Sequence, residues 1–136
     1  LLLDAGGIVT VNGILSACGD YSAGGDEGGG GSGGSIWGTA PSIRGNGTIS
    51  VNGGAGGNKL IRSGGGGGGR ILLVHGQVED IGERDAGILS DEPHSRLDFT
   101  GAVTVTGGTG GMNNGKDGTI RYLFRPPPMG TMFMLL

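Results

Sequence analysis

The chain has few of the residues on which most folded domains are built. Its 136 residues include one tryptophan, two tyrosines and three phenylalanines, which argues against a core anchored by large aromatic side chains. Five prolines and the lack of a strict Gly-X-Y period exclude a collagen triple helix. A single cysteine, Cys18, excludes an internal disulfide. We predict that Cys18 is a small buried apolar residue, with an intermolecular link as the alternative.

Charge of one sign and long apolar runs are also scarce. Nine Lys and Arg residues against twelve Asp and Glu give a net charge of −3, and no basic patch exists that could neutralise phosphates. This argues against nucleic-acid binding. No run of about 18 apolar residues is present, so no transmembrane helix is expected. The chain begins Leu1-Leu2-Leu3-Asp4 without an initiator Met or signal peptide, as a mature product or a fragment would.

Glycine, in contrast, supplies 36 residues. An ordered glycine costs roughly 0.5–1 kcal/mol relative to alanine, so such segments are either disordered or placed where only glycine fits. A hydrophobic fraction of 35% with only 15% charged residues argues against disorder. We therefore predict that the run 64–69 is ordered and closely packed by neighbouring backbone. Gly67→Val is then expected to destabilise the protein strongly through a steric clash.

The sequence contains an internal repeat. The segments Gly7–Gly13, Gly47–Gly53 and Gly101–Gly107 align without gaps, and each alternates apolar with small polar residues. This period of two predicts half-buried strands. The side chains predicted to point inward are Val9, Val11, Ile49, Val51, Val103 and Val105.

A second set of motifs follows the first. Gly34–Trp37, Gly69–Leu72 and Gly118–Arg121 each open a strand after a glycine-rich stretch. The unit of strand, turn, glycine-rich segment and strand thus occurs three times. The first motif starts at residues 7, 47 and 101, and the extra length of the second interval falls in the acidic segment 77–96. We interpret that segment as a loop inserted into a repeat.

These patterns predict an all-β fold, specifically a parallel β-solenoid (β-helix) with glycine-rich turns or polyglycine-II-like segments. An antiparallel β-sandwich or roll is the alternative. A single glycine-rich domain is expected over residues 1–124. Residues 125–136 are expected to form a proline-rich linker and then an apolar terminal strand.

Three segments also carry a resemblance to a known group of proteins. They are GGGGSGGSIW at 28–37, GNGTISVNGG at 45–54 and GGGGGGRI at 64–71. This succession, over most of residues 5–124, resembles glycine-rich repeat surface proteins of bacteria, protists, algae and plants, which carry GGGSGGSI, GxGxISANGG and GGGGGGRI segments in that order. The resemblance implies a β-helical, adhesin-like or cell-wall-associated protein, and it supplies no catalytic residues to transfer to this chain. The chain departs from that pattern at residues 38–41, where a strand would usually continue, and in the acidic insertion.

Candidate sites for chemistry are sparse. A phosphate-binding loop needs Gly-Lys-Ser/Thr before a helix, and Gly69-Arg70-Ile71 offers neither the lysine nor the hydroxyl. His75 and His94 are too far apart for a zinc site without cysteine partners. The acidic insertion is interpreted as a solvated loop, with a calcium site as the alternative. The carboxylates that would hold calcium are Asp80, Glu83 and Asp85.

Two surface motifs remain. Asn46-Gly47-Thr48 is an N-glycosylation sequon at a predicted turn, so Asn46 is the candidate glycan acceptor. Thr104-Val105-Thr106 is similar to the threonine rows of ice-binding solenoids. Only one true Thr-x-Thr occurs, which argues against a regular ice-binding row.

The sequence therefore predicts a non-enzymatic extracellular structural protein without cofactors, which forms a surface filament or cell-wall assembly by head-to-tail contact with itself. An adhesin-like module that recognises glycans or surfaces is the alternative. A carbohydrate-active enzyme ranks last, because the strands carry almost no carboxylates. Deleting residues 129–136 is expected to leave a folded monomer. The apolar residues predicted to mediate assembly are Leu1, Leu2, Leu3, Phe133, Leu135 and Leu136.

Overall fold

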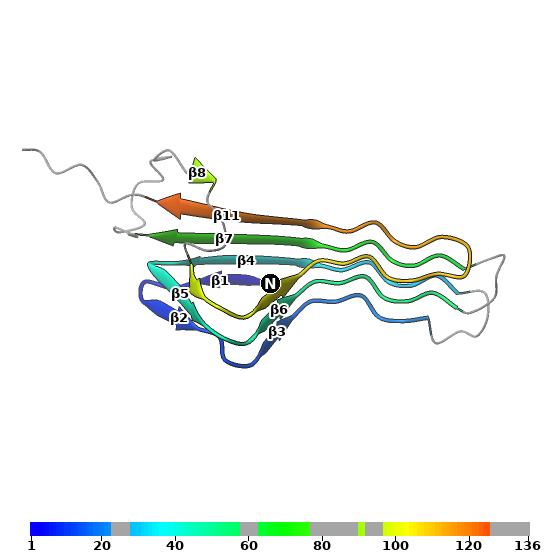
Figure 1. Ribbon diagram of the computed structural model, residues 1–136, viewed down its shortest axis with the longest axis horizontal. Helices are drawn as coiled ribbons and strands as arrows, with labels where there is room; N and C mark the ends of the chain where they lie inside the picture. The colour runs from blue at the N-terminus through cyan, green and yellow to red at the C-terminus, as the bar shows by residue number, and fades with distance from the viewer. Residues whose placement is uncertain (23–27, 58–62, 77–89, 92–96, 126–136) are drawn as a thin grey trace, which may run out of the picture.

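The computed structural model describes residues 1–22, 28–57, 63–76, 90–91 and 97–125. These residues form short β-strands and extended segments and contain no helix, which confirms the all-β prediction. Figure 1 shows the strands gathered in one half of the molecule, with long extended segments projecting from them in layers.

The largest sheet, sheet A, contains one strand from each pass of the chain. Its parallel strands lie in the order β1 (Leu2–Asp4), β4 (Ser35–Ala40), β7 (Arg70–Gly76) and β11 (Thr119–Arg125). The short strand β8 (Ser90–Asp91) pairs with β11 in antiparallel orientation. β4 continues through Gly38 to Ala40, so the chain does not leave the strand at residues 38–40 as the sequence suggested.

Two smaller sheets are entirely parallel. Sheet B is formed by β2 (Ile8–Thr10), β5 (Ser42–Gly45) and β9 (Asp98–Phe99). Sheet C is formed by β3 (Ile14–Ser16), β6 (Thr48–Ser50) and β10 (Ala102–Thr104). The chain passes through sheets A, B and C in the same order three times and then returns to sheet A with β11. We call each pass a tier: β1–β3, β4–β6, and β7, β9 and β10. Because every pairing between the described strands except β8–β11 is parallel, the antiparallel alternative is wrong.

The strand register tests the two sets of repeat motifs. The second set is confirmed, since Ile71 pairs with Ile36 on one side and with Ile120 on the other. In the first set, Val103 pairs with Ile49 as predicted, but the tier-one partner of Ile49 is Leu15. Gly7–Gly13 was therefore aligned with the wrong segment: its strand β2 belongs to sheet B, beside β5.

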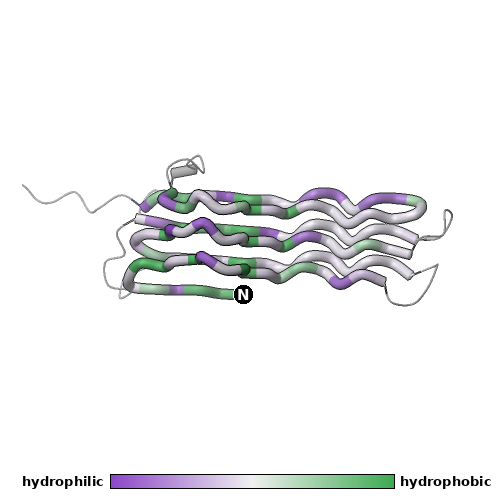
Figure 2. The backbone as a smooth tube through the Cα atoms, turned by 60° about the horizontal axis from the view of Figure 1, so that its bottom comes forward, coloured by the Kyte–Doolittle hydropathy of each residue, from purple (hydrophilic) through white to green (hydrophobic). Residues whose placement is uncertain are grey.

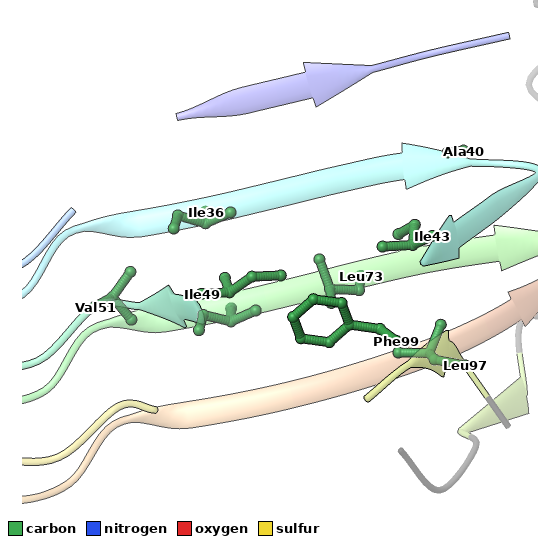
Figure 3. Packing of buried hydrophobic residues seen from close by; sticks show 9 residues of the cluster. Ile36, Ala40, Ile43, Ile49, Val51, Leu73, Leu97 and Phe99 are labelled. Carbon is green, nitrogen blue, oxygen red and sulfur yellow. The ribbon is translucent and has the colours of Figure 1, made fainter. Parts of the chain in front are cut away.

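The apolar core lies between the three sheets, and Figure 3 shows its side chains converging from strands of all three. It consists of Ile36, Ala40, Ile43, Ile49, Val51, Ile71, Leu73, Leu97 and Phe99. Ile49 and Val51 are buried, as predicted. Val9, Val11, Val103 and Val105 face this core but are only half-buried, because they lie on the first and last tiers and lack a neighbouring tier on one side.

The glycine-rich residues form six extended arms, which appear as pale segments of near-neutral hydropathy beside the apolar strands in Figure 2. Arms 17–22, 51–57 and 105–111 follow sheet C, and arms 28–34, 63–69 and 113–118 lead into sheet A. Each group forms a row of parallel arms. Within the first row, Gly53 and Gly56 donate backbone hydrogen bonds to Thr106 and Thr109.

The two rows are joined by antiparallel contacts. Gly54 and Gly57 donate their backbone N–H groups to the carbonyls of Gly31 and Gly28, at 2.8 and 2.9 Å. Bonds to a given neighbour therefore recur every third residue, which is the period of a polyproline-II-like helix. We call this array the glycine lattice.

Steric contact explains why the lattice needs glycine. A Cβ atom on Gly66 would lie 1.9 Å from the carbonyl oxygen of Gly31, whereas a Cβ on Gly67 would meet Lys116 O at 3.7 Å. In the central arms, two positions of each three face another backbone and the third faces outward. The prediction of an ordered, closely packed run at 64–69 is confirmed. The expectation that Gly67→Val would clash is wrong, because Gly67 occupies an outward position.

Candidate functional site

The first tier leaves one end of the stack open, and we call it the N-pole: β1, β2, β3 and arm 17–22. Within the described residues each of these strands pairs on one edge only. Val9, Val11 and Leu15 face the core from this tier and remain half-buried. The outward side chains Ile8 and Ile14 are 57% and 80% exposed. The N-pole thus combines unpaired strand edges with incompletely covered apolar side chains.

The backbone at the N-pole is directed to accept another strand. The N–H of Val11 donates to the carbonyl of Arg44 in the neighbouring tier, at 2.9 Å. In a parallel ladder, successive residues direct their backbone groups to opposite edges. The N–H and carbonyl of Thr10 therefore face the open edge.

The opposite end, the C-pole, is formed by β9, β10 and β11 with arms 105–111 and 113–118. Here β8 covers part of the sheet A edge, pairing Ser90 with Phe124 and Asp91 with Leu123. Ile120 and Tyr122 face the core and are half-buried. Burial raises the pKa of the Tyr122 phenol. The C-pole is thus partly covered in sheet A.

The two poles form complementary steps. The arms alternate between the rows, because 28–34 bonds to 17–22, and 113–118 bonds to 105–111. At the N-pole the outermost arm is 17–22, of the first row, and at the C-pole it is 113–118, of the second row. Arm 17–22 of another copy could therefore lie antiparallel to arm 113–118 with the same contacts that the lattice uses internally.

The structure places half of the predicted assembly residues. Leu1 and Leu2 are 60% and 68% exposed, and Leu3 is half-buried. The terminal amine of Leu1 donates to the carbonyl of Ser35, at 2.6 Å, which ties the chain start to β4. Phe133, Leu135 and Leu136 lie outside the described residues, as does the whole of segment 126–136.

The other candidate residues are dispersed. Asn46 is exposed between β5 and β6, after Gly45 with a φ of +120°, so the predicted turn at the sequon is present. His75 lies near the end of β7 and its ring is 5.2 Å from that of Phe124. His94 and the calcium candidates Asp80, Glu83 and Asp85 lie outside the described residues. In the described part of the chain, no three His, Cys, Asp or Glu side chains form a group that could hold a metal ion.

Cys18 is exposed, so the prediction of a buried residue is wrong. It lies on arm 17–22, whose outer side has no neighbouring arm among the described residues. Ser16 Oγ donates to Sγ at 3.3 Å, and the backbone N–H of Asn52 donates at 3.2 Å. Hydrogen bonds with Ser16 and Ser50 lower the pKa of the thiol below its ordinary value.

These hydrogen bonds should have a measurable effect on the reactivity of the Cys18 thiol. Hydrogen-bond donors stabilise the thiolate, which is the nucleophile, so Ser16→Ala should raise the pKa of Cys18. We expect the pH midpoint of iodoacetamide alkylation to move upward and the rate at neutral pH to fall. Ser32→Ala, on a different arm, is the control and should leave the midpoint in place. An unchanged midpoint in Ser16→Ala would show that Ser16 does not act on the thiol.

Sequence reasoning missed one prominent residue, Trp37. Its side chain is 52% exposed on the outer face of β4, while Ile36, Gly38 and Ala40 point inward and are buried. The alternation that buries Ile36 could have placed Trp37 on the outside, had the strand been extended past residue 37.

Comparison with protein-family models, with curated proteins and with solved structures gives no match. Among the residues that the structure describes, none belongs to a helix long and apolar enough to cross a membrane.

Proposed function

We propose that the protein is a non-enzymatic, extracellular structural subunit, a parallel β-solenoid whose tiers stack on those of another copy. The observation that carries this proposal is the N-pole, where three strands and one arm present unpaired edges. Exposed strand edges readily pair with another chain unless they are blocked. Among the described residues no strand or arm covers the first tier, and a repeated structure with an uncapped end is suited to end-to-end association.

Simple energetics support stacking. Fully burying an apolar side chain contributes roughly 1.5–3 kcal/mol, and association costs about 4–15 kcal/mol in lost freedom. Val9, Val11 and Leu15 are already half-buried, so completing their burial would contribute only part of the burial energy of a side chain in each case. Backbone hydrogen bonds across the junction, at about 1 kcal/mol each, would supply the rest. The free energy therefore depends on strand and arm pairing as well as on apolar contact.

The number of strands suggests how the poles meet. In the described residues, sheets B and C have three strands each, whereas sheet A has four parallel strands. If β2 and β3 of one copy stack on β9 and β10 of another, then β1 and β11 compete for the same place beside β4. We infer that β11 takes that place and that β1, which pairs through only three residues, is displaced. β8, which pairs with β11 only at Leu123 and Phe124, must then leave the same edge. Every sheet then receives three strands from each copy.

A concentration series in the analytical ultracentrifuge tests the proposal. We expect the full chain to sediment as species that grow with concentration, because a non-closing contact between unlike poles makes open chains. A chain that remains monomeric at every concentration would contradict self-assembly. An adhesin-like binding module would then be the better account, and Trp37 is the observation that favours it.

A further inference from the structure

The outer face of sheet A presents the sole tryptophan of the chain. Trp37 is on β4, between β1 and β7, and its indole is 52% exposed rather than packed in the core. Tryptophan is a large apolar residue that is usually well buried, and its exposure on a sheet commonly marks a contact surface. We therefore expect the exposed face around Trp37 to contact another molecule.

The strand register places the neighbours of Trp37 in a row. Leu2 on β1 and Leu72 on β7 flank it, and Arg121 on β11 follows Leu72. With strands about 4.8 Å apart, the row is about 14 Å long. Leu2 is exposed and Leu72 half-buried, so the row is an apolar strip that ends at a cation.

Polar side chains border this strip. On one side, Ser35, Arg70 and Thr119 occupy one register position and are all exposed. On the other side, Thr39 lies beside Asp4. The cations Arg70 and Arg121 lie on β7 and β11, and the carboxylate of Asp4 lies on β1. The chain as a whole has a net charge of −3, so this side of the face is a local exception.

We propose that this face, the strip of Leu2, Trp37 and Leu72 with its bordering polar residues, binds an anionic polysaccharide. The flat C–H surface of a sugar ring fits the indole and leucine side chains, and hydroxyls can bond to Ser35 and Thr119. Carboxylate or sulfate groups are suited to Arg70, because a guanidinium offers paired donors to a planar anion. A row of side chains across a sheet face suits an extended polymer better than a small molecule, which takes a concave site.

This inference goes beyond the structural role proposed above. The face runs along the side of the stack from one pole to the other, so end-to-end assembly leaves Trp37 and Leu72 accessible and changes only the strand beside β4. In an assembly Trp37 and Leu72 would recur once for each copy, with β11 of the neighbouring copy in the place of β1, and a long polymer could contact several copies at once. Such multivalency strengthens weak individual contacts.

The emission of Trp37 provides the test, since no other tryptophan contributes. The full chain is titrated with polygalacturonate, and with hydroxyethyl cellulose as an uncharged polymer. We expect a saturable blue shift with polygalacturonate only, and weakening of binding by added salt. The double variant Arg70→Gln with Arg121→Gln should bind about tenfold or more weakly. Arg44→Gln, an exposed arginine on sheet B, is the matched control and should bind as the unaltered chain does.

Several results would overturn the proposal. Emission unaffected by polygalacturonate would remove it, as would an equal response to hydroxyethyl cellulose. Equal affinity of the Arg70 and Arg121 variant and the Arg44 control would show that these cations do not recognise the polymer. All titrations use one protein concentration, because assembly would replace β1 with β11 of another copy and so change the surroundings of Trp37. These readouts do not depend on sedimentation, so the failure of assembly and the failure of glycan binding can be told apart.

Discussion

Gly66→Ala is expected to destabilise the protein by about 3 kcal/mol or more, the upper end of the range for overpacked cores. The added Cβ would lie 1.9 Å from the carbonyl oxygen of Gly31 and 2.4 Å from its carbon. A backbone group cannot rotate away as a side chain can, so the arms must separate. That separation would break the hydrogen bond from Gly66 N–H to the Gly54 carbonyl, at 2.9 Å, and others near it.

Gly67→Ala, one residue further, is the matched control. Its Cβ would be in ordinary contact with Lys116 O at 3.7 Å, and Gly67 does not have a positive φ. Replacing such a glycine restricts the unfolded chain, so we expect Gly67→Ala to stabilise by about 0.4–1 kcal/mol. Denaturant unfolding of both variants measures the difference. Equal stability of the two would contradict the three-residue period of the lattice.

Thr10→Pro is expected to abolish assembly while leaving the fold intact. The Thr10 N–H faces the open edge of β2, and proline is tolerated on edge strands whose N–H points away from the sheet. A proline at this position removes a donor and puts its ring where the next strand would lie. We expect a monomer at concentrations where the unaltered chain associates, measured by sedimentation velocity.

Thr10→Ala controls for loss of the threonine side chain and should associate like the unaltered chain. Circular dichroism and thermal melting establish that both variants are folded. If folded Thr10→Pro associates as readily as Thr10→Ala, the N-pole is not the contact surface.

The sequence predicted three strands of sheet A, β4, β7 and β11, because a glycine run followed by an apolar pattern marks them clearly. It did not predict β1, which no glycine run precedes. It also predicted the pairing of Ile49 with Val103. It failed at the first tier, where Gly7–Gly13 was chosen over the segment that starts at Gly13. Both segments alternate apolar and polar residues. Gly7–Gly13 was chosen because it ends in the same Val-Asn-Gly sequence as Gly47–Gly53.

The physical reason for that error is at the end of the stack. In the second tier, β6 is followed at once by glycine-rich residues 51–57, which identifies it. In the first tier, β3 is followed by Ala-Cys-Gly-Asp-Tyr-Ser, because arm 17–22 has neighbours on fewer sides. Gly19 is the one glycine in that arm, and a Cβ there would lie 1.9 Å from the carbonyl oxygen of Gly31. An edge arm therefore lacks the composition by which arms are recognised.

The sequence also could not predict which positions of the glycine lattice face a neighbouring backbone and which face outward. Six consecutive glycines at 64–69 have no pattern that separates inward from outward positions, so Gly67 was taken as a packed residue. Arm 51–57 shows that phase, since Asn52 and Ala55 occupy outward positions and glycines fill positions 53, 54, 56 and 57. The prediction for Cys18 was wrong and Trp37 was missed for a related reason. Residue type alone does not indicate which face of a strand or arm is open to solvent.

Fibre diffraction from aligned assemblies tests the central claim, that copies stack tier upon tier, most directly. With strands running across the stack, the strong reflection at about 4.8 Å should lie along the fibre axis. Three tiers per copy should add an axial repeat of about 14 Å. A 4.8 Å reflection perpendicular to the axis would place the strands along the fibre and would contradict stacking through the poles.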